Sequence, residues 1–244
     1  MQQRAYQRTS SNPMLNEERI RALSETTGQT AMTANGAVNK TTILLMIVFA
    51  GALVGWNSPL GSFTLVSAFG ALIIAIITAF KPSIAPITAP IYAILEGLLL
   101  GGISSFLEQS YPGIAFQAIV GTISVFFIMM ILYRTGAIKV TDRFRSIIVS
   151  AIMGIMATYL ISFVLSFFMQ VPLFTGGWLA IGFSAFVIII AAFSLLLDFD
   201  MIERSETFGA PKYMEWYCAF SLLVTLVWLY FEILRLLSML RGRE

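Results

Sequence analysis

The stretch SLLLDFDMIERSE, residues 194–206, ends a long apolar run with two aspartates, Asp198 and Asp200. The apolar run that leads into it, residues 178–198, has about the 20 residues that a helix needs to cross a lipid bilayer. A short polar stretch follows, and the chain then turns apolar again from residue 216. This pattern predicts two membrane-spanning helices joined by a polar link, with carboxylates where the first helix leaves the membrane.

The rest of the chain repeats the pattern. Of the 244 residues, 58% are hydrophobic and 11% are charged, against about 25% charged in an ordinary soluble domain. The lipid core cannot satisfy loop backbone, so each apolar run should be a helix. The sequence therefore predicts an all-α membrane protein with seven transmembrane helices, at residues 41–56, 62–80, 87–107, 114–133, 146–169, 178–198 and 216–239.

Basic residues fall on alternate links between these runs. Links after the second, fourth and sixth runs contain Lys or Arg, as does the segment before the first run, whereas links after the first, third and fifth contain none. The positive-inside rule then predicts a cytoplasmic N-terminus. We expect a polar cytoplasmic segment at 1–38 and a seven-helix domain at 39–244. Arg241 and Arg243 in the tail break the alternation, and leave open six spans with a re-entrant last segment.

The residue types present exclude several classes of enzyme. The chain has no histidine and one cysteine, Cys218, which removes Ser-His and Cys-His nucleophile systems and histidine metal sites. An intramembrane aspartyl protease would need two aspartates from different helices. The aspartates are Asp142, in a basic link, and Asp198 and Asp200, on one run. We expect no enzymatic activity, no cofactor and no nucleic-acid partner.

Two acids lie within predicted spans, where a charge costs at least about 2.5–3.5 kcal/mol. Glu96 is near the middle of the third run and has no basic residue near it in sequence. It either belongs to an ion or proton pathway or forms a protonated hydrogen bond between helices. Glu232 in the last run is three residues before Arg235, so the two can pair on one helix face. A structural ion pair and a role in the pathway both remain open for them.

Three further acids are predicted at the cytoplasmic ends of the last two spans. Asp198 and Asp200 are two residues apart, so on a helix they point to nearly opposite faces, and Asp200 can pair with Arg204 one turn later. Glu215 begins the last run at the same level. If the three gather, they can attract a proton or hold calcium transiently, because like charges raise one another's pKa and calcium prefers oxygen ligands.

Several motifs in one order resemble a known family. LLLDFDMIE at 195–203, EGLLLGG at 96–102, YPGI at 111–114 and APKYMEWY at 210–217 are similar to the transmembrane Bax inhibitor motif family, and more closely to its bacterial YccA-like branch. The resemblance implies a bundle with the last helix central, and a pH-dependent calcium leak closed by an aspartate pair between helices six and seven. Asp200 matches the first aspartate, whereas the partner position falls near Thr225, which is not an acid.

The leading hypothesis is a pH-sensitive ion leak, for calcium or protons, in the plasma membrane (the bacterial inner membrane). The pathway residues would be Asp200, Asp198, Glu215, Glu96 and Glu232, with Arg204 and Arg235 as salt-bridge partners. The alternative is a non-conducting regulator that binds a membrane protease or another membrane protein.

Overall fold

The computed structural model describes residues 31–57, 62–169 and 177–242. Within these ranges the chain folds into long helices with short links. The elements are α2 (Ala34–Trp56), α3 (Ser62–Phe80), the 3-10 turn η2 (Pro82–Ile84), α4 (Ala85–Ser110), α5 (Ile114–Arg134), α6 (Asp142–Ser166), α7 (Trp178–Thr207) and α8 (Met214–Arg241).

Local sequence sets where several helices begin and end. The hydroxyl of Thr33 accepts a hydrogen bond from Gly36 N at the start of α2, and Thr141 does the same for Phe144 N at the start of α6. These caps satisfy backbone donors that have no partner inside the helix. The turn before α5 places Gly113 at a φ of 84°, a left-handed conformation that glycine adopts without steric cost.

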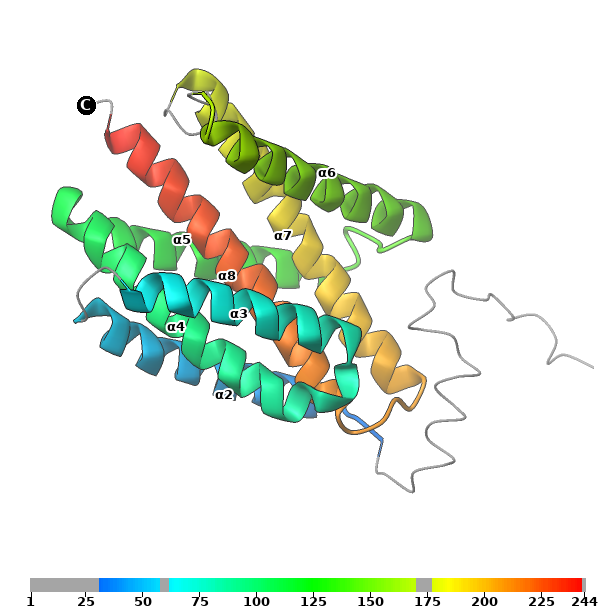
Figure 1. Cartoon of the computed structure of the whole chain (residues 1–244). Coiled ribbons are helices and arrows are strands. Elements are labelled where there is room, and N and C mark those ends of the chain that lie inside the picture. The colour runs from blue at the N-terminus through cyan, green and yellow to red at the C-terminus, as the bar shows by residue number, and fades with distance from the viewer. Residues whose placement is uncertain (1–30, 58–61, 170–176, 243–244) are drawn as a thin grey trace, which may run out of the picture.

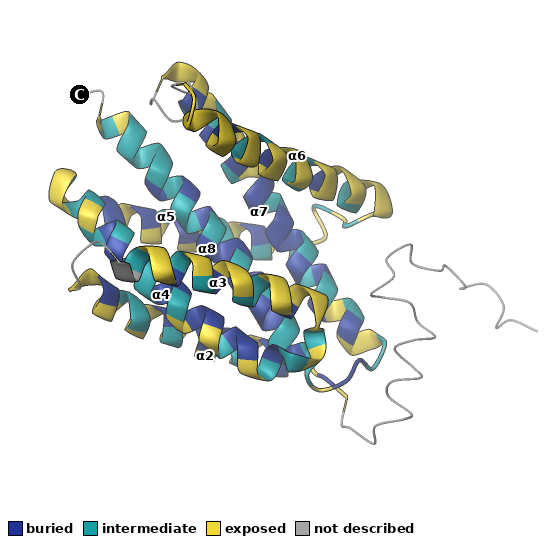
Figure 2. Ribbon diagram, viewed as in Figure 1, coloured by how far each residue is buried: buried dark blue, intermediate teal, exposed yellow. Residues whose placement is uncertain are grey.

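The helices form a bundle with α8 at its centre (Figure 1). α8 packs against α2, α4, α5 and α7, and its buried residues continue from Glu215 to Leu234. Figure 2 shows the exposed residues mainly on the outer helices, including most of α6. The predicted all-α bundle with a central last helix is confirmed.

All helices run between the same two ends of the bundle. At one end α2, α4, α6 and α8 begin, and α3, α5 and α7 end (Figure 1). We call it the basic end, because it holds the basic residues Lys40, Lys81, Arg145, Arg204 and Lys212. α8 is continuous, and Arg241 in its last turn donates to Pro112 O at the opposite end. The structure thus has a full-length last helix and not the re-entrant segment that the sequence left open.

Glycines bring α2 and α4 into close contact. A Cβ atom on Gly97 would lie 2.5 Å from Val48 O, and one on Gly55 or Gly101 would collide with the facing backbone. Small residues let helix backbones approach where lipid supplies no hydrophobic driving force between helices. Gly97 and Gly101 of α4 therefore make a close backbone contact with α2.

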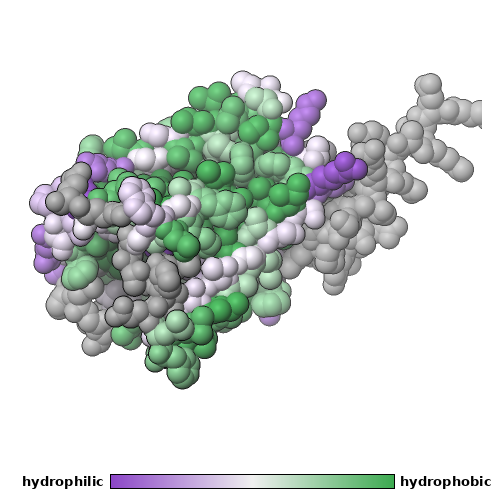
Figure 3. All heavy atoms as spheres, turned by 90° about the horizontal axis from the view of Figure 1, so that it is seen from above, coloured by the Kyte–Doolittle hydropathy of each residue, from purple (hydrophilic) through white to green (hydrophobic). Residues whose placement is uncertain are grey.

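The sides of the bundle are apolar. Figure 3 shows hydrophobic surface between polar groups near the ends. Six of the described helices are long and apolar enough to cross a membrane, and α3 adds a shorter apolar stretch, Thr64–Phe80. This surface fits a protein surrounded by lipid.

Several helices extend beyond the predicted runs, as α7 does by continuing past residue 198 to Thr207. The first run was expected to begin at residue 41, but α2 begins at Ala34, because the Thr33 cap starts the helix seven residues earlier. Residues 34–38, which the sequence placed in the polar N-terminal segment, are helical. Residues 1–30 of that segment lie outside the described residues.

Candidate functional site

Asp198 on α7 lines a cavity of about 540 Å³ between α3, α6, α7 and α8. Its side chain is buried, and its Oδ1 accepts a 2.6 Å hydrogen bond from Ser221 Oγ on α8. Its Oδ2 has no hydrogen-bond partner within 3.5 Å among the described residues, and the hydroxyl of Thr225 also lies near this carboxylate. A buried carboxylate oxygen without a partner is costly, so this atom is the first candidate for binding a proton or a cation.

Asp200 is not among the residues that line that cavity, but it forms two ion pairs, one of them with Arg145, which does line it. Its Oδ2 accepts from Arg145 at the start of α6 and lies 2.7 Å from Arg204 Nε, one turn later on α7. The Asp200–Arg204 pair was predicted from the sequence. Arg145 was not, because a pairing between distant helices leaves no local signal.

Glu215 is fully buried at the start of α8, where it holds the first turn of α2. Lys212 Nζ lies 2.7 Å from Oε1 and Lys40 Nζ lies 3.2 Å from Oε2. The backbone N–H and the hydroxyl of Thr33 both donate to Oε1, at 3.1 and 3.2 Å. These contacts compensate the carboxylate charge and fix α2 against α8.

The three acids at this end do not gather. Within residues 31–57, 62–169 and 177–242, no group of three or more His, Cys, Asp or Glu side chains could hold a metal ion. The reason is that each acid has partners of its own. Arginines hold Asp200, lysines hold Glu215, and a hydroxyl group holds Asp198. Of the three, Asp198 alone lines the cavity.

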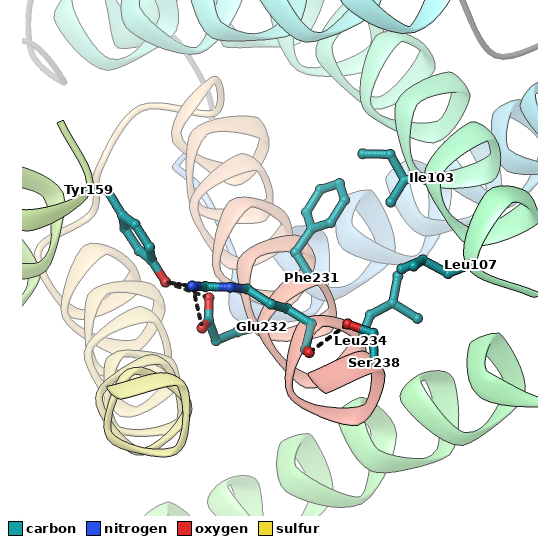
Figure 4. Close-up of a pocket in the computed structure, with 8 residues that line it drawn as sticks. Ile103, Leu107, Tyr159, Phe231, Glu232, Leu234 and Ser238 are labelled. Atoms are coloured by element: carbon teal, nitrogen blue, oxygen red, sulfur yellow. Dashed lines mark hydrogen bonds and ion pairs between the residues drawn. The ribbon is translucent and has the colours of Figure 1, made fainter. Parts of the chain in front are cut away.

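Glu232 forms a second polar cluster, nearer the opposite end (Figure 4). Its Oε1 accepts from Ser184 Oγ on α7 at 2.7 Å, and its Oε2 accepts from Tyr159 OH on α6 at 2.9 Å. Arg235 Nη1 lies 3.3 Å from Oε1, in the pairing predicted from the sequence, and donates to Tyr159 OH at 2.7 Å. A cavity of about 330 Å³ lies beside this cluster, between α4, α6 and α8.

Glu96 lies apart from both clusters. It is buried on α4, and has no hydrogen bond or ion pair with another residue that the structure describes. Residues on either side of it on its helix face α8: Tyr92, one turn before it, packs edge-on against Phe220, and Ser104, about two turns after it, is 2.7 Å from the hydroxyl of Tyr230. Glu96 is therefore a further buried acid, on a part of α4 that packs against α8.

The two polar clusters lie on one continuous seam between α7 and α8. The seam consists of residues spaced alternately by three and four on each helix, which places them on a single face. Its members are Ser184, Val187, Ala191, Ser194 and Asp198 on α7, and Ser221, Thr225, Trp228, Glu232 and Arg235 on α8.

The middle of the seam is apolar. Trp228 packs in the hydrophobic clusters that include Val187 and Ala191, and it also lines the Asp198 cavity. From Ser221 to Glu232 the distance along α8 is about 16 Å, at a rise of about 1.5 Å per residue. Trp228 thus separates two polar levels of one seam.

Sequence reasoning identified the acids and missed most of their partners. Ser184, Ser194 and Ser221 are unremarkable singly, but their spacing relative to Asp198 and Glu232 was a readable signal. Tyr159 and Arg145 on α6 carried no such signal, because their positions depend on how α6 packs on α7.

The fold and these sites together define a helical, multi-pass membrane protein with carboxylates buried in its bundle. The family described as Bax inhibitor 1 like matches residues 12–242, nearly the whole sequence. The chain belongs to this family, as its resemblance suggested. No curated protein matches the chain.

Proposed function

We propose that the chain is a pH-sensitive cation leak of the plasma membrane, that calcium is the ion, and that its seam carboxylates control the flow. The observation that carries the proposal is Asp198, a buried carboxylate that lines a 540 Å³ cavity and has one oxygen without a hydrogen-bond partner among the described residues. Acids at membrane depth are rare, and by default they indicate ion or proton pathways.

The orientation that we propose follows from charge. The basic end carries lysines and arginines on its links, so it faces the cytoplasm under the positive-inside rule. Asp198 is nine residues before the end of α7, about 14 Å along the helix from that end. A cation from the cytoplasm would pass Arg145, whose charge Asp200 offsets in part because Arg204 shares the same carboxylate oxygen, before it reaches Asp198.

The pathway that we propose runs along the seam. Ser194, Ser221 and Thr225 line the cavity with Asp198 and offer hydroxyl oxygens, the ligand type that calcium accepts. Beyond them Trp228 lies between the cavity and Glu232, and in this proposal its side chain is the barrier to flow. Protonation of Asp198 would remove the charge that attracts a cation, which makes the leak sensitive to pH.

The test is calcium entry into liposomes that contain the purified full-length chain and a calcium dye, at several values between about pH 6 and 8. We expect flux that rises with pH, and low, pH-independent flux for Asp198→Asn, which resembles the protonated acid. Asp142→Asn, the same change on an exposed residue, is the control. Flux with unaltered pH dependence in Asp198→Asn would refute the role of this acid.

A second variant tests the barrier. Trp228→Ala should raise calcium flux, because it removes the side chain between the two polar levels. Each 1.4 kcal/mol taken from the barrier would raise the flux about tenfold. If neither the wild type nor Trp228→Ala conducts calcium above the level of empty liposomes, the leak is excluded. The alternative function, a regulator that binds another membrane protein, is then favoured.

A further inference from the structure

The cavity that Asp198 lines is much larger than an inorganic cation requires. Its volume is about 540 Å³, within the range of about 300–1,000 Å³ typical of sites for small organic molecules. Most of its lining residues are apolar and come from four helices. The cavity therefore has the size and wall chemistry to hold an organic molecule.

The cavity opens sideways, toward lipid. Ile76 on α3 and Val149 on α6 form its rim and are 49% and 47% exposed. In the described part of the chain α3 packs mainly on α4, and α6 packs on α7. The ribbons of α3 and α6 lie apart in Figure 1, and residues of both line the cavity. In a membrane protein this opening faces acyl chains, and a molecule dissolved in the bilayer can enter directly.

The back wall has the chemistry that recognises an organic ammonium ion. Asp198 supplies a carboxylate whose Oδ1 is held by Ser221 and whose Oδ2 has no hydrogen-bond partner among the described residues. Tyr217, Phe220 and Trp228 line the same cavity. Aromatic faces attract cations, and a carboxylate bonds an ammonium group more strongly than it bonds a neutral donor.

The one basic side chain at the cavity does not cancel this preference. Arg145 lines it, but its guanidinium group is paired with Asp200. Asp198 belongs to no ion pair in the described residues. The cavity thus keeps one carboxylate that forms no ion pair with a basic side chain in the described part of the chain.

We propose that this cavity binds a lipophilic ammonium ion that enters from the bilayer between α3 and α6. The ammonium group meets Asp198, and the apolar body lies against Ile76, Val149 and the aromatic residues. Such a ligand would occupy the same carboxylate as the proposed pathway and block it. That block rests on the proposed function, whereas the binding does not.

Binding is measured with the full-length chain in nanodiscs, by calorimetry after subtraction of empty nanodiscs. The probe is decylamine, which is protonated at neutral pH, and decanol is its uncharged match. We expect saturable binding of decylamine and none of decanol. Asp198→Asn should weaken the binding at least about tenfold, as loss of a charge-assisted contact implies, whereas Asp142→Asn should bind like the wild type.

A second variant covers the case in which Asp198→Asn fails to fold. Ile76→Trp places a bulky group on the exposed rim and should reduce binding with the carboxylate intact. Equal binding of decanol, unaltered binding in both variants, or no saturable binding in the wild type would each overturn the proposal. Calcium flux in the same preparations separates the two ideas: flux without amine binding overturns the amine site alone, and amine binding without flux overturns the leak alone.

Discussion

The ion pairs of Asp200 allow a sharp prediction, because two arginines approach the same oxygen in different structural settings. Arg204 is on the same helix, one turn later, whereas Arg145 comes from α6. In the described residues α6 packs on α7 and makes few other helix contacts. Loss of Arg145 therefore loosens the attachment of a helix, and loss of Arg204 does not.

The structure sets the expected size of each effect. Exposed ion pairs contribute about 0–1 kcal/mol, and breaking a fully buried pair costs about 3–5 kcal/mol. The side chains of Arg145 and Asp200 are 20% and 11% exposed, so Arg145→Gln should cost about 1–3 kcal/mol. Arg204→Gln removes a pair within one helix and should cost about 0.3–0.5 kcal/mol. Asp200→Asn should cost most, because it leaves two arginines facing each other.

The assay is chemical unfolding in a lipid-like detergent for the three single variants and for the double variant Arg145→Gln/Asp200→Asn. The double-mutant cycle should give a coupling energy of at least about 0.5 kcal/mol, as residues in contact usually do. Equal losses for Arg145→Gln and Arg204→Gln, or a coupling indistinguishable from zero, would refute the reasoning that Asp200 attaches α6.

Three other variants test the packing. Gly101→Ala should destabilise the fold by about 1–3 kcal/mol, because its Cβ atom would collide with Ala52 O. The control is Gly154→Ala, whose Cβ atom would meet no atom within 4 Å and which should be tolerated. Thermal unfolding compares the stabilities of the two variants. Glu96→Leu should stabilise the fold by about 1–3 kcal/mol, because it removes a buried polar group without a described partner, and a loss of stability would show that this acid is satisfied. Glu215→Gln should speed hydrogen exchange of the first-turn amides of α2, and unchanged exchange would contradict its role in holding that turn.

The sequence predicted the helices well and their partners poorly, for a physical reason. Membrane-spanning runs are encoded locally by about 20 apolar residues, so each run reappears as a helix. The hydrogen-bond and ion-pair partners of a buried acid depend on how the helices are rotated and packed against one another, which no local sequence pattern encodes. Ser221 is 23 residues from Asp198, and Arg145 is 55 residues from Asp200.

For Glu215, the error in the predicted start of the first helix also made the predicted site wrong. The sequence placed Lys40 immediately before the first span, which was predicted to begin at residue 41. Because α2 begins at Ala34, Lys40 is in its second turn and reaches Glu215. Two lysines then hold the acid that was expected to join Asp198 and Asp200. The expected group of three acids fails at this step, and Asp198 remains as the carboxylate that lines the cavity.

The position of α6 links the two polar levels of the seam. Near the basic end Arg145 joins α6 to Asp200, and toward the opposite end Tyr159 joins it to Glu232 and Arg235. The two cavities lie beside these two contacts, and residues of α6 line both. A displacement of α6 would therefore break both polar contacts together and widen both cavities. It would also free space beside Trp228, whose packing against Ile148 and Ile155 of α6 depends on that helix. Under the two proposals, one displacement of α6 would therefore widen the amine cavity and open the seam to ions together.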